Sequence, residues 1–184
     1  MLLFGSSIVG SGLFSVRSSG RIGAVNSPLI NPNNLHIDGF YCHTHNGQYS
    51  GIVIDQVIRA ISYKGVIIDN HEDISEPNDL VRLKSVIDIK FQLIGKAVYS
   101  GNSKIGKVIN YVFDDKSLFI IKLHVQPSLL KSFGSSELII DRQSIIEVSD
   151  SRITISDNTV KESPAVGQKF STSFNSATTS AISE

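Results

Sequence analysis

Residues 21–25 read Arg-Ile-Gly-Ala-Val, and residues 104–108 read Lys-Ile-Gly-Lys-Val. Both stretches carry an Ile-Gly pair with a valine two positions later, at an offset of 83 in numbering (105 minus 22). The offset continues downstream, where Ile30 falls on Phe113. A repeat at this separation indicates two copies of one structural unit.

A polar turn follows each copy of this stretch at the same place. Residues 31–34 are Asn-Pro-Asn-Asn and residues 114–117 are Asp-Asp-Lys-Ser, and apolar residues resume with Ile37 and Ile120. Asn and Asp bond their own backbone and tolerate left-handed angles, while Pro fixes φ, so such clusters form turns. Each copy is therefore predicted to form a β-hairpin here.

The match extends in both directions. Upstream, residues 3–8 resemble residues 93–98, after which the first copy has seven more residues before its Ile-Gly pair (22 minus 8 is 14; 105 minus 98 is 7). This extra length is rich in Gly and Ser and predicts an enlarged hairpin loop. Downstream, residues 58–62 resemble residues 145–149, and each is followed by a polar turn and a short β-run.

Short β-runs separated by turn residues are typical of small antiparallel barrels. The sequence thus predicts an all-β protein with two tandem barrels and a single short linker helix. The predicted organisation is a first barrel at 1–72, a linker at 73–92, a second barrel at 93–156 and a disordered Ser/Thr-rich tail at 157–184. A barrel of about 70 residues has a thin core. We therefore expect the two barrels to pack on each other and either half alone to be less stable.

The linker helix is expected at about residues 77–87. Leu80, Leu83 and Ile87 fall at i, i+3 and i+7, and Pro77 suits a first helical turn. The tail is expected to be disordered because its low aliphatic content cannot offset the entropy of ordering it.

The repeated motif resembles that of the PRC-barrel family, whose typical stretch reads Leu-x-Gly-x-x-Val, then a turn, then Ile-Gly-x-Val. The likeness spans about residues 2–155. The positions that carry it are Gly5, Ile22, Gly23 and Val25 in the first copy, and Gly95, Ile105, Gly106 and Val108 in the second. The resemblance implies a barrel used as a protein-binding module rather than as an enzyme. Gly23 and Gly106, inside strand-like runs, indicate a bulge, a barrel corner or a close backbone approach.

Composition excludes several classes of protein. Lys plus Arg and Asp plus Glu each number 17, so the net charge is zero, and the sequence has neither the basic balance that points to nucleic acid nor the acidic one of a solvating tail. Cys42 is the only cysteine, which excludes an intramolecular disulfide. The apolar start lacks the basic residues of a signal peptide. No segment is long and apolar enough for a transmembrane helix. We expect a soluble, cytoplasmic protein.

One cluster has side chains that bind metals. Cys42, His43 and His45 stand close together, and thiolate and imidazole are metal ligands. A structural site needs four ligands, and the Asn-Gly pair that follows predicts a turn, so a polar strand end is the favoured interpretation. A Cys-His nucleophile would need a base and an oxyanion donor that no motif marks. We predict neither an enzyme nor a cofactor.

Four cations, at Arg17, Arg21, Lys104 and Lys107, fall on equivalent parts of the two copies and could form a basic patch for RNA or anionic lipid. The leading hypothesis is nonetheless a non-catalytic adaptor or scaffold that binds a protein partner. An RNA- or ribosome-associated maturation factor is the alternative. The sequence identifies neither the partner nor the oligomeric state.

Overall fold

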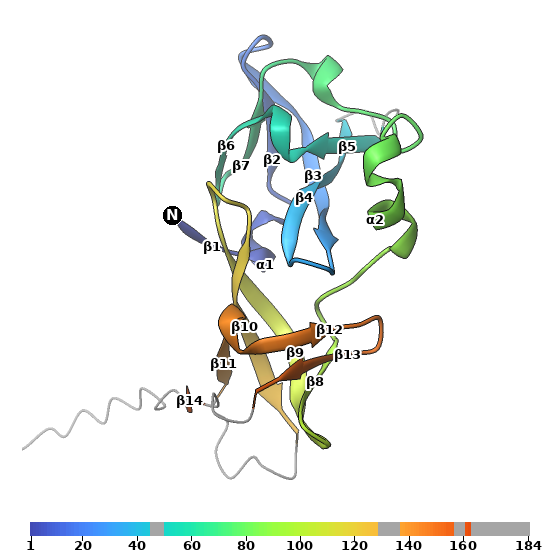
Figure 1. Cartoon of the computed structure of the whole chain (residues 1–184). Helices are drawn as coiled ribbons and strands as arrows, with labels where there is room; N and C mark the ends of the chain where they lie inside the picture. Colours follow the sequence, from blue (N-terminus) through green and yellow to red (C-terminus); the bar gives the residue numbers. More distant parts are fainter. Residues whose placement is uncertain (45–49, 129–136, 157–160, 163–184) are drawn as a thin grey trace, which may run out of the picture.

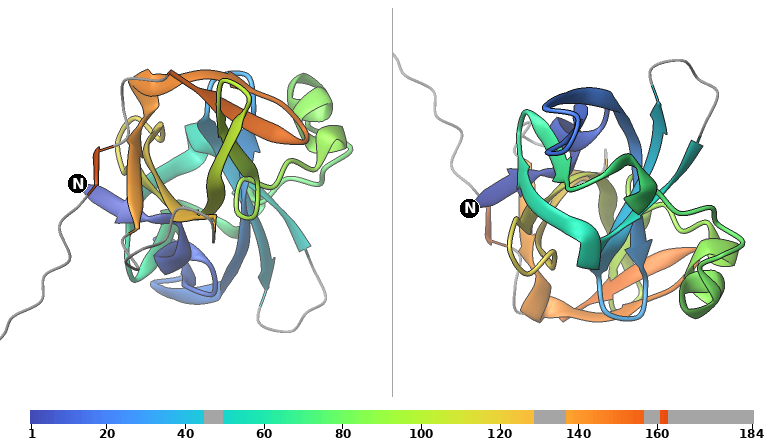
Figure 2. Two further views of the ribbon diagram at one scale, coloured as in Figure 1. Left: turned by 90° about the horizontal axis from the view of Figure 1, so that it is seen from below. Right: turned by 90° about the horizontal axis from the view of Figure 1, so that it is seen from above.

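The computed structural model describes residues 1–44, 50–128, 137–156 and 161–162 of the chain. These residues form two strongly curled β-sheets, one above the other in Figure 1, with a short helix on one flank. The predicted all-β class is confirmed. The views along the long axis in Figure 2 show how each sheet curls around its interior as a half-barrel.

The first sheet contains six strands in the order β5-β4-β3-β2-β7-β6. A 3₁₀ turn, η1 (Asp55–Val57), joins β5 to β6. The strands are β2 (Gly12–Ser15), β3 (Gly20–Asn31), β4 (His36–Thr44), β5 (Ser50–Ile54), β6 (Ile58–Ser62) and β7 (Gly65–Ile68).

The second sheet repeats this order as β11-β10-β9-β8-β13-β12. Its connection between β11 and β12 is again a 3₁₀ turn, η5 (Arg142–Ser144). The strands are β8 (Ala97–Ser100), β9 (Ser103–Asp114), β10 (Ile120–Pro127), β11 (Leu138–Asp141), β12 (Ile145–Val148) and β13 (Arg152–Ile155). The structure thus repeats strand for strand, as the sequence repeat predicts.

Two further strands join the second sheet only. β1 (Leu2–Phe4) pairs with β9, and β14 (Lys161–Glu162) pairs with β11. β1 therefore lies outside the predicted first barrel, because it leaves its own repeat and adds to the other sheet. β14 lies within the predicted disordered tail. The remainder of that tail, 157–160 and 163–184, is outside the described residues.

Each sheet contains one parallel pair, where the sequence analysis expected antiparallel strands throughout. β7 runs parallel to β2, and β13 runs parallel to β8. The β6–β7 hairpin folds back across the first sheet, so that β7 pairs with the edge of β2 that β3 does not occupy. The β12–β13 hairpin does the same in the second sheet, where β13 pairs with β8. A local hairpin pattern does not specify this longer-range pairing.

The upstream alignment of the two copies is wrong by five residues. Gly10 donates its backbone N–H to the Val25 carbonyl, just as Gly95 donates to the Val108 carbonyl, and both glycines have positive φ (81° and 89°). Gly10, not Gly5, is thus the equivalent of Gly95. Leu13 pairs with Gly23, ten positions later, and Val98 pairs with Gly106, eight positions later. The first hairpin is therefore only two residues longer than the second.

Gly5 has a different role in the structure. It lies in the four-residue helix α1 (Gly5–Ile8), and a Cβ added there would come 2.2 Å from the Tyr111 ring. Tyr111 belongs to β9 of the second repeat and is 2% exposed. Gly5 therefore allows the first turn after β1 to lie directly on the second sheet.

Gly23 and Gly106 occupy equivalent close approaches, as their sequence setting predicts. A Cβ at Gly23 would come 2.1 Å from the His43 carbonyl oxygen, and one at Gly106 would come 2.0 Å from the Gln126 carbonyl oxygen. In each repeat the glycine lets a neighbouring strand cross close to the long central strand.

The tips of the two long hairpins bind each other. The Ile37 backbone N–H donates to the Leu118 carbonyl, and the Ile120 N–H donates to the Leu35 carbonyl, both at 2.9 Å. Leu35 and Leu118 have nearly equal positive φ values, 54° and 56°. The pairs of contacts are reciprocal, so the two repeats meet around a local pseudo-twofold axis, like the halves of an isologous dimer.

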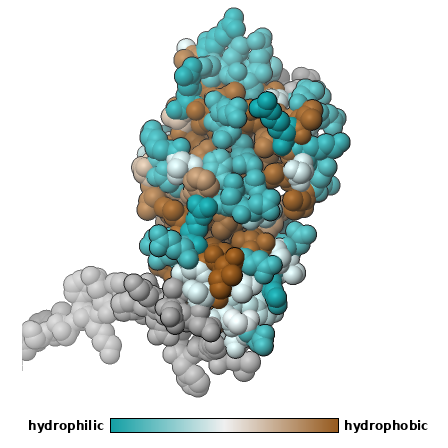
Figure 3. All heavy atoms as spheres, in the orientation of Figure 1, coloured by the Kyte–Doolittle hydropathy of each residue, from teal (hydrophilic) through white to brown (hydrophobic). Residues whose placement is uncertain are grey.

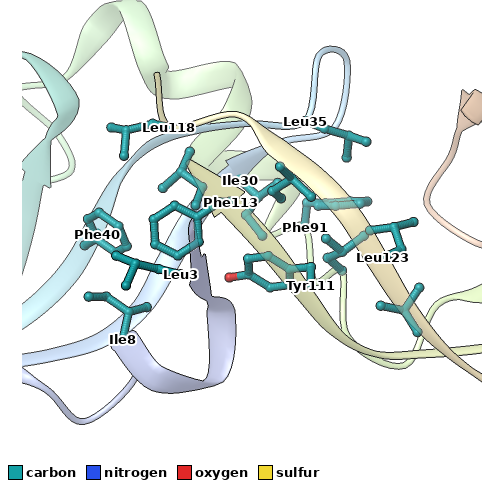
Figure 4. Close-up of a cluster of buried hydrophobic side chains, with 14 of the residues drawn as sticks. Leu3, Ile8, Ile30, Leu35, Phe40, Phe91, Tyr111, Phe113, Leu118 and Leu123 are labelled. Atoms are coloured by element: carbon teal, nitrogen blue, oxygen red, sulfur yellow. The ribbon is translucent and has the colours of Figure 1, made fainter. Parts of the chain in front are cut away.

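A single hydrophobic core spans both repeats. Figure 4 shows Ile8 and Phe40 of the first repeat, together with Leu3 of β1, clustered with Tyr111, Phe113 and Leu123 of the second. The expected packing of the two copies on each other is confirmed. Because the apolar surface is shared, neither repeat has a complete core by itself.

The linker helix begins later than predicted. A 3₁₀ turn, η3 (Val81–Leu83), leads into α2 (Lys84–Ile89), and Pro77 lies ahead of both. Leu80, Leu83 and Ile87 do pack together, with Val86, against Leu29 and Ile52 of the first sheet. Within the described ranges, none of the helices is long and apolar enough to cross a membrane.

Candidate functional site

A groove of about 570 Å³ opens between the two repeats beside β3. One wall is the outer edge of β3, and the other is the segment that leads from α2 into β8. Residues 26–30 form the first wall, residues 90–94 form the second, and Gly5, Val9, Tyr41 and Tyr111 complete the lining. The volume falls within the range of ordinary ligand-binding pockets.

The lining of the groove is mainly apolar. Val9, Pro28 and Ile94 contribute apolar surface that is at least partly exposed, and Lys90 is the only charged residue among the lining residues that the structure describes. Burial raises the pKa of the Tyr41 phenol above its ordinary value, so this side chain adds no charge to the groove. A site with this chemistry suits an uncharged or acidic apolar ligand better than a basic one.

Local backbone structure sets the position of the second wall. Lys90 caps α2 in a left-handed conformation with φ of 50°, which ends the helix and turns the chain toward β8. Phe91 and Leu93 then point into the core, being 9% and 2% exposed. Ile94, between Leu93 and Gly95, is half exposed at the rim.

The opposite rim carries an exposed valine. Val9 follows α1, lines the groove and is 49% exposed. Val16 in the β2–β3 turn is similarly exposed at 58% but does not line the groove. The remaining surface is mixed: on the face in Figure 3, apolar patches alternate with hydrophilic side chains and do not merge into one continuous area.

The structure separates the residues of the predicted metal cluster. Cys42 is 1% exposed inside the core, where its thiol contacts the Phe40 carbonyl, and burial raises its thiol pKa to about 12. His43 is half-buried on the other side of β4, and its Nδ1 contacts the Asn26 side-chain oxygen. Neighbouring strand residues point to opposite faces, so Cys42 and His43 cannot share an ion.

His45 lies outside the described residues. Among the residues that the structure does describe, no group of three His, Cys, Asp or Glu side chains could hold a metal ion.

One histidine–carboxylate pair lies at the contact between the repeats. His36 Nδ1 is 2.6 Å from Asp38 Oδ1, and the Asn31 amide donates to the other Asp38 oxygen at 3.1 Å. The His36 ring packs edge-on against Phe119, which also stacks against the Arg142 guanidinium at 4.4 Å. These contacts fasten the two hairpin tips together, and we assign the pair a structural role.

The four predicted basic residues do not form one patch. Arg17 and Arg21 flank the β2–β3 turn, and Lys104 and Lys107 follow the β8–β9 turn. Figure 1 places these turns at opposite ends of the molecule. The pseudo-twofold relation between the repeats is the reason, since it directs equivalent turns away from each other.

Comparison with known proteins found neither a matching family model nor a matching curated protein.

Sequence reasoning missed the groove itself. Its walls come from β3 and from a linker segment about 60 residues later, and no local motif joins them. Pro28 is the one feature of the sequence that indicates this site, because a proline within a strand is found where the strand has no neighbour on the side of the missing N–H.

Proposed function

We propose that this protein is a non-catalytic adaptor or scaffold that binds another protein in the groove between its repeats. The groove carries the proposal: it is apolar, of ligand size and bounded by the edge of a strand. The residues that resemble the PRC-barrel motif support it, since such barrels serve as protein-binding modules. The proposal includes a cytoplasmic location, consistent with a single unpaired cysteine, and no cofactor.

The rigidity of the scaffold supports the same proposal. The repeats are joined by reciprocal backbone hydrogen bonds and a common core, so both walls of the groove are fixed in relative position. A preformed site loses less conformational entropy on binding than one that must be assembled.

The test is an affinity pull-down of the tagged full-length protein from native lysate, with and without ribonuclease. Two variants accompany the wild type. Val9→Lys places a charge at the groove rim, and Val16→Lys places the same charge at the β2–β3 turn. We expect a stoichiometric protein partner that survives ribonuclease, is lost with Val9→Lys and is retained with Val16→Lys.

Two results would contradict the proposal. Recovery of ribosomal or RNA-binding proteins that disappear with ribonuclease would favour the RNA-associated alternative. A partner that binds Val9→Lys as well as the wild type would exclude the groove as its site.

A further inference from the structure

The two repeats differ in what covers the edge of their long central strand. In the second repeat, β1 adds to β9, with Leu3 opposite Phe113. The Asp115 N–H extends this pairing by donating to the Met1 carbonyl. One edge of β9 is therefore closed by a three-residue strand.

The equivalent edge of β3 lies at Ile30. Ile30 pairs with Ile37 in the first repeat, as Phe113 pairs with Ile120 in the second. The Ile37 N–H donates to Leu118 and so points away from β3. In an antiparallel ladder, two residues that face each other both direct their N–H and C=O groups either toward the partner strand or away from it. Ile30, which faces Ile37, therefore also directs these groups away from β4. The backbone of Ile30 thus faces the groove.

No strand closes this edge in the part of the chain that the structure describes. β3 pairs only with β4 and, through residues 20–24, with β2. The segment that leads into the second repeat forms α2 instead of a strand, and α2 packs through Val86 near Leu29. This break in the symmetry leaves the groove beside Ile30, where β1 lies in the other repeat.

Two prolines limit how long an added strand could be. Pro28 precedes Ile30 by two residues and points its backbone to the same side, and Pro32 follows by two. Neither has an N–H to donate. Prolines commonly protect exposed strand edges against uncontrolled pairing. Between Pro28 and Pro32, only Ile30 directs a backbone N–H to this side of β3.

We propose that the groove binds an extended segment of a protein partner by strand addition, antiparallel to β3, with one apolar side chain opposite Ile30. The segment exchanges two backbone hydrogen bonds with Ile30, and its central side chain fills the apolar groove. This is the binding mode in which main-chain bonds give affinity and a pocket gives specificity. The inference rests on the proposed function and adds the kind of segment that is recognised.

β1 shows what such a segment looks like. Its central residue, Leu3, is 5% exposed, while Leu2 and Phe4 on either side are 55% and 47% exposed. Only the central position must therefore be apolar. Lys90 carries the only charge among the described residues of the groove lining, and it favours an uncharged or acidic segment over a basic one.

The probe is the peptide acetyl-Glu-Leu-Leu-Phe-Gly-Ser-amide, which copies residues 2–6 behind a glutamate. It is titrated into the ¹⁵N-labelled full-length protein, and the amide signals of Ile30 and Phe113 are followed. We expect saturable shifts at Ile30 below about 1 mM peptide, with Phe113 unchanged. A second peptide is methylated on the backbone nitrogen of its second leucine, and we expect it to bind about tenfold more weakly because one hydrogen bond is lost.

Three results would overturn strand addition: no shift at Ile30, shifts at Phe113 instead, or equal binding of the methylated peptide. Shifts at Phe113 would mean that the peptide replaces β1 and leaves the groove empty. The pull-down separates this failure from failure of the proposed function. A partner that is lost with Val9→Lys while the peptides fail would keep the groove as a binding site but exclude this mode of binding.

Discussion

The close approach at Gly106 offers the sharpest test of the fold. In Gly106→Ala, the new Cβ would lie 2.0 Å from the Gln126 carbonyl oxygen, which is 1.0 Å inside the 3.0 Å limit that real Cβ atoms observe (3.0 minus 2.0). The obstacle is backbone in β10, so the two central strands of the sheet must separate. Overpacking of this kind costs about 1–3 kcal/mol, and weakening the local ladder adds about 1 kcal/mol.

The expected loss for Gly106→Ala is therefore about 3 kcal/mol, or roughly 6–12 °C in Tm for a chain of this size. The assay is urea unfolding with a parallel thermal melt. Gly20→Ala is the matched control, because its Cβ would meet only the Ser18 carbonyl oxygen at 3.7 Å. We expect the control to stay within about 0.5 kcal/mol of the wild type.

A larger side chain extends the comparison. Gly106→Val should destabilise the protein at least as much as the alanine variant, whereas Lys107→Val, on an exposed strand position, should be nearly neutral. Equal Tm values for Gly106→Ala and Gly20→Ala would refute the close approach of β10 to Gly106. They would also remove the shared feature by which Gly106 and Gly23 are equivalent.

Three further predictions follow from other parts of the fold. Because burial raises the Cys42 thiol pKa to about 12, we expect its alkylation at pH 8 to be very slow in the folded protein and rapid in urea; equal rates would place the thiol at the surface. Arg59 lowers the pKa of Asp69, so this pair stabilises the fold above the unfolded-state pKa, and its contribution is lost as the pH falls through the lower folded-state value. Arg59→Gln should thus lower Tm slightly at pH 7 and by less at acidic pH, where more of the folded protein has Asp69 protonated, and an equal loss at both pH values would exclude the ion pair as its cause. Because the core is shared, residues 1–72 and 73–162 expressed separately should each show a weaker unfolding transition than the intact chain, and a half that is as stable as the whole would contradict the common core.

The sequence predicted the features that rest on local patterns. The Ile-Gly pairs at residues 22–23 and 105–106 identified the repeat, and the polar turns after Ile30 and Phe113 identified its hairpins. These predictions held because bulges, turns and strand alternation depend on neighbouring residues.

The features that the sequence did not predict depend on contacts between distant segments. Gly5 was matched to Gly95 because both follow a Leu-x pattern, whereas Gly10, preceded by Ile8, has the equivalent hydrogen bond. The transfer of β1 to the second sheet and the unpaired strand edge at Ile30 arise only when the two repeats are packed together. Tertiary packing decides strand pairing of this kind, and no window of local sequence contains it.

Amide hydrogen exchange at two equivalent positions reports directly whether the edge of β3 lacks a strand partner. Phe113 and Ile30 occupy the same place in the two repeats, but β1 pairs only with the edge at Phe113. We predict that the Ile30 amide of the wild-type protein exchanges at least about tenfold faster than the Phe113 amide, because it lacks a strand partner. Equal protection of the two amides would show that the β3 edge is already closed, and would contradict a groove that receives a partner strand.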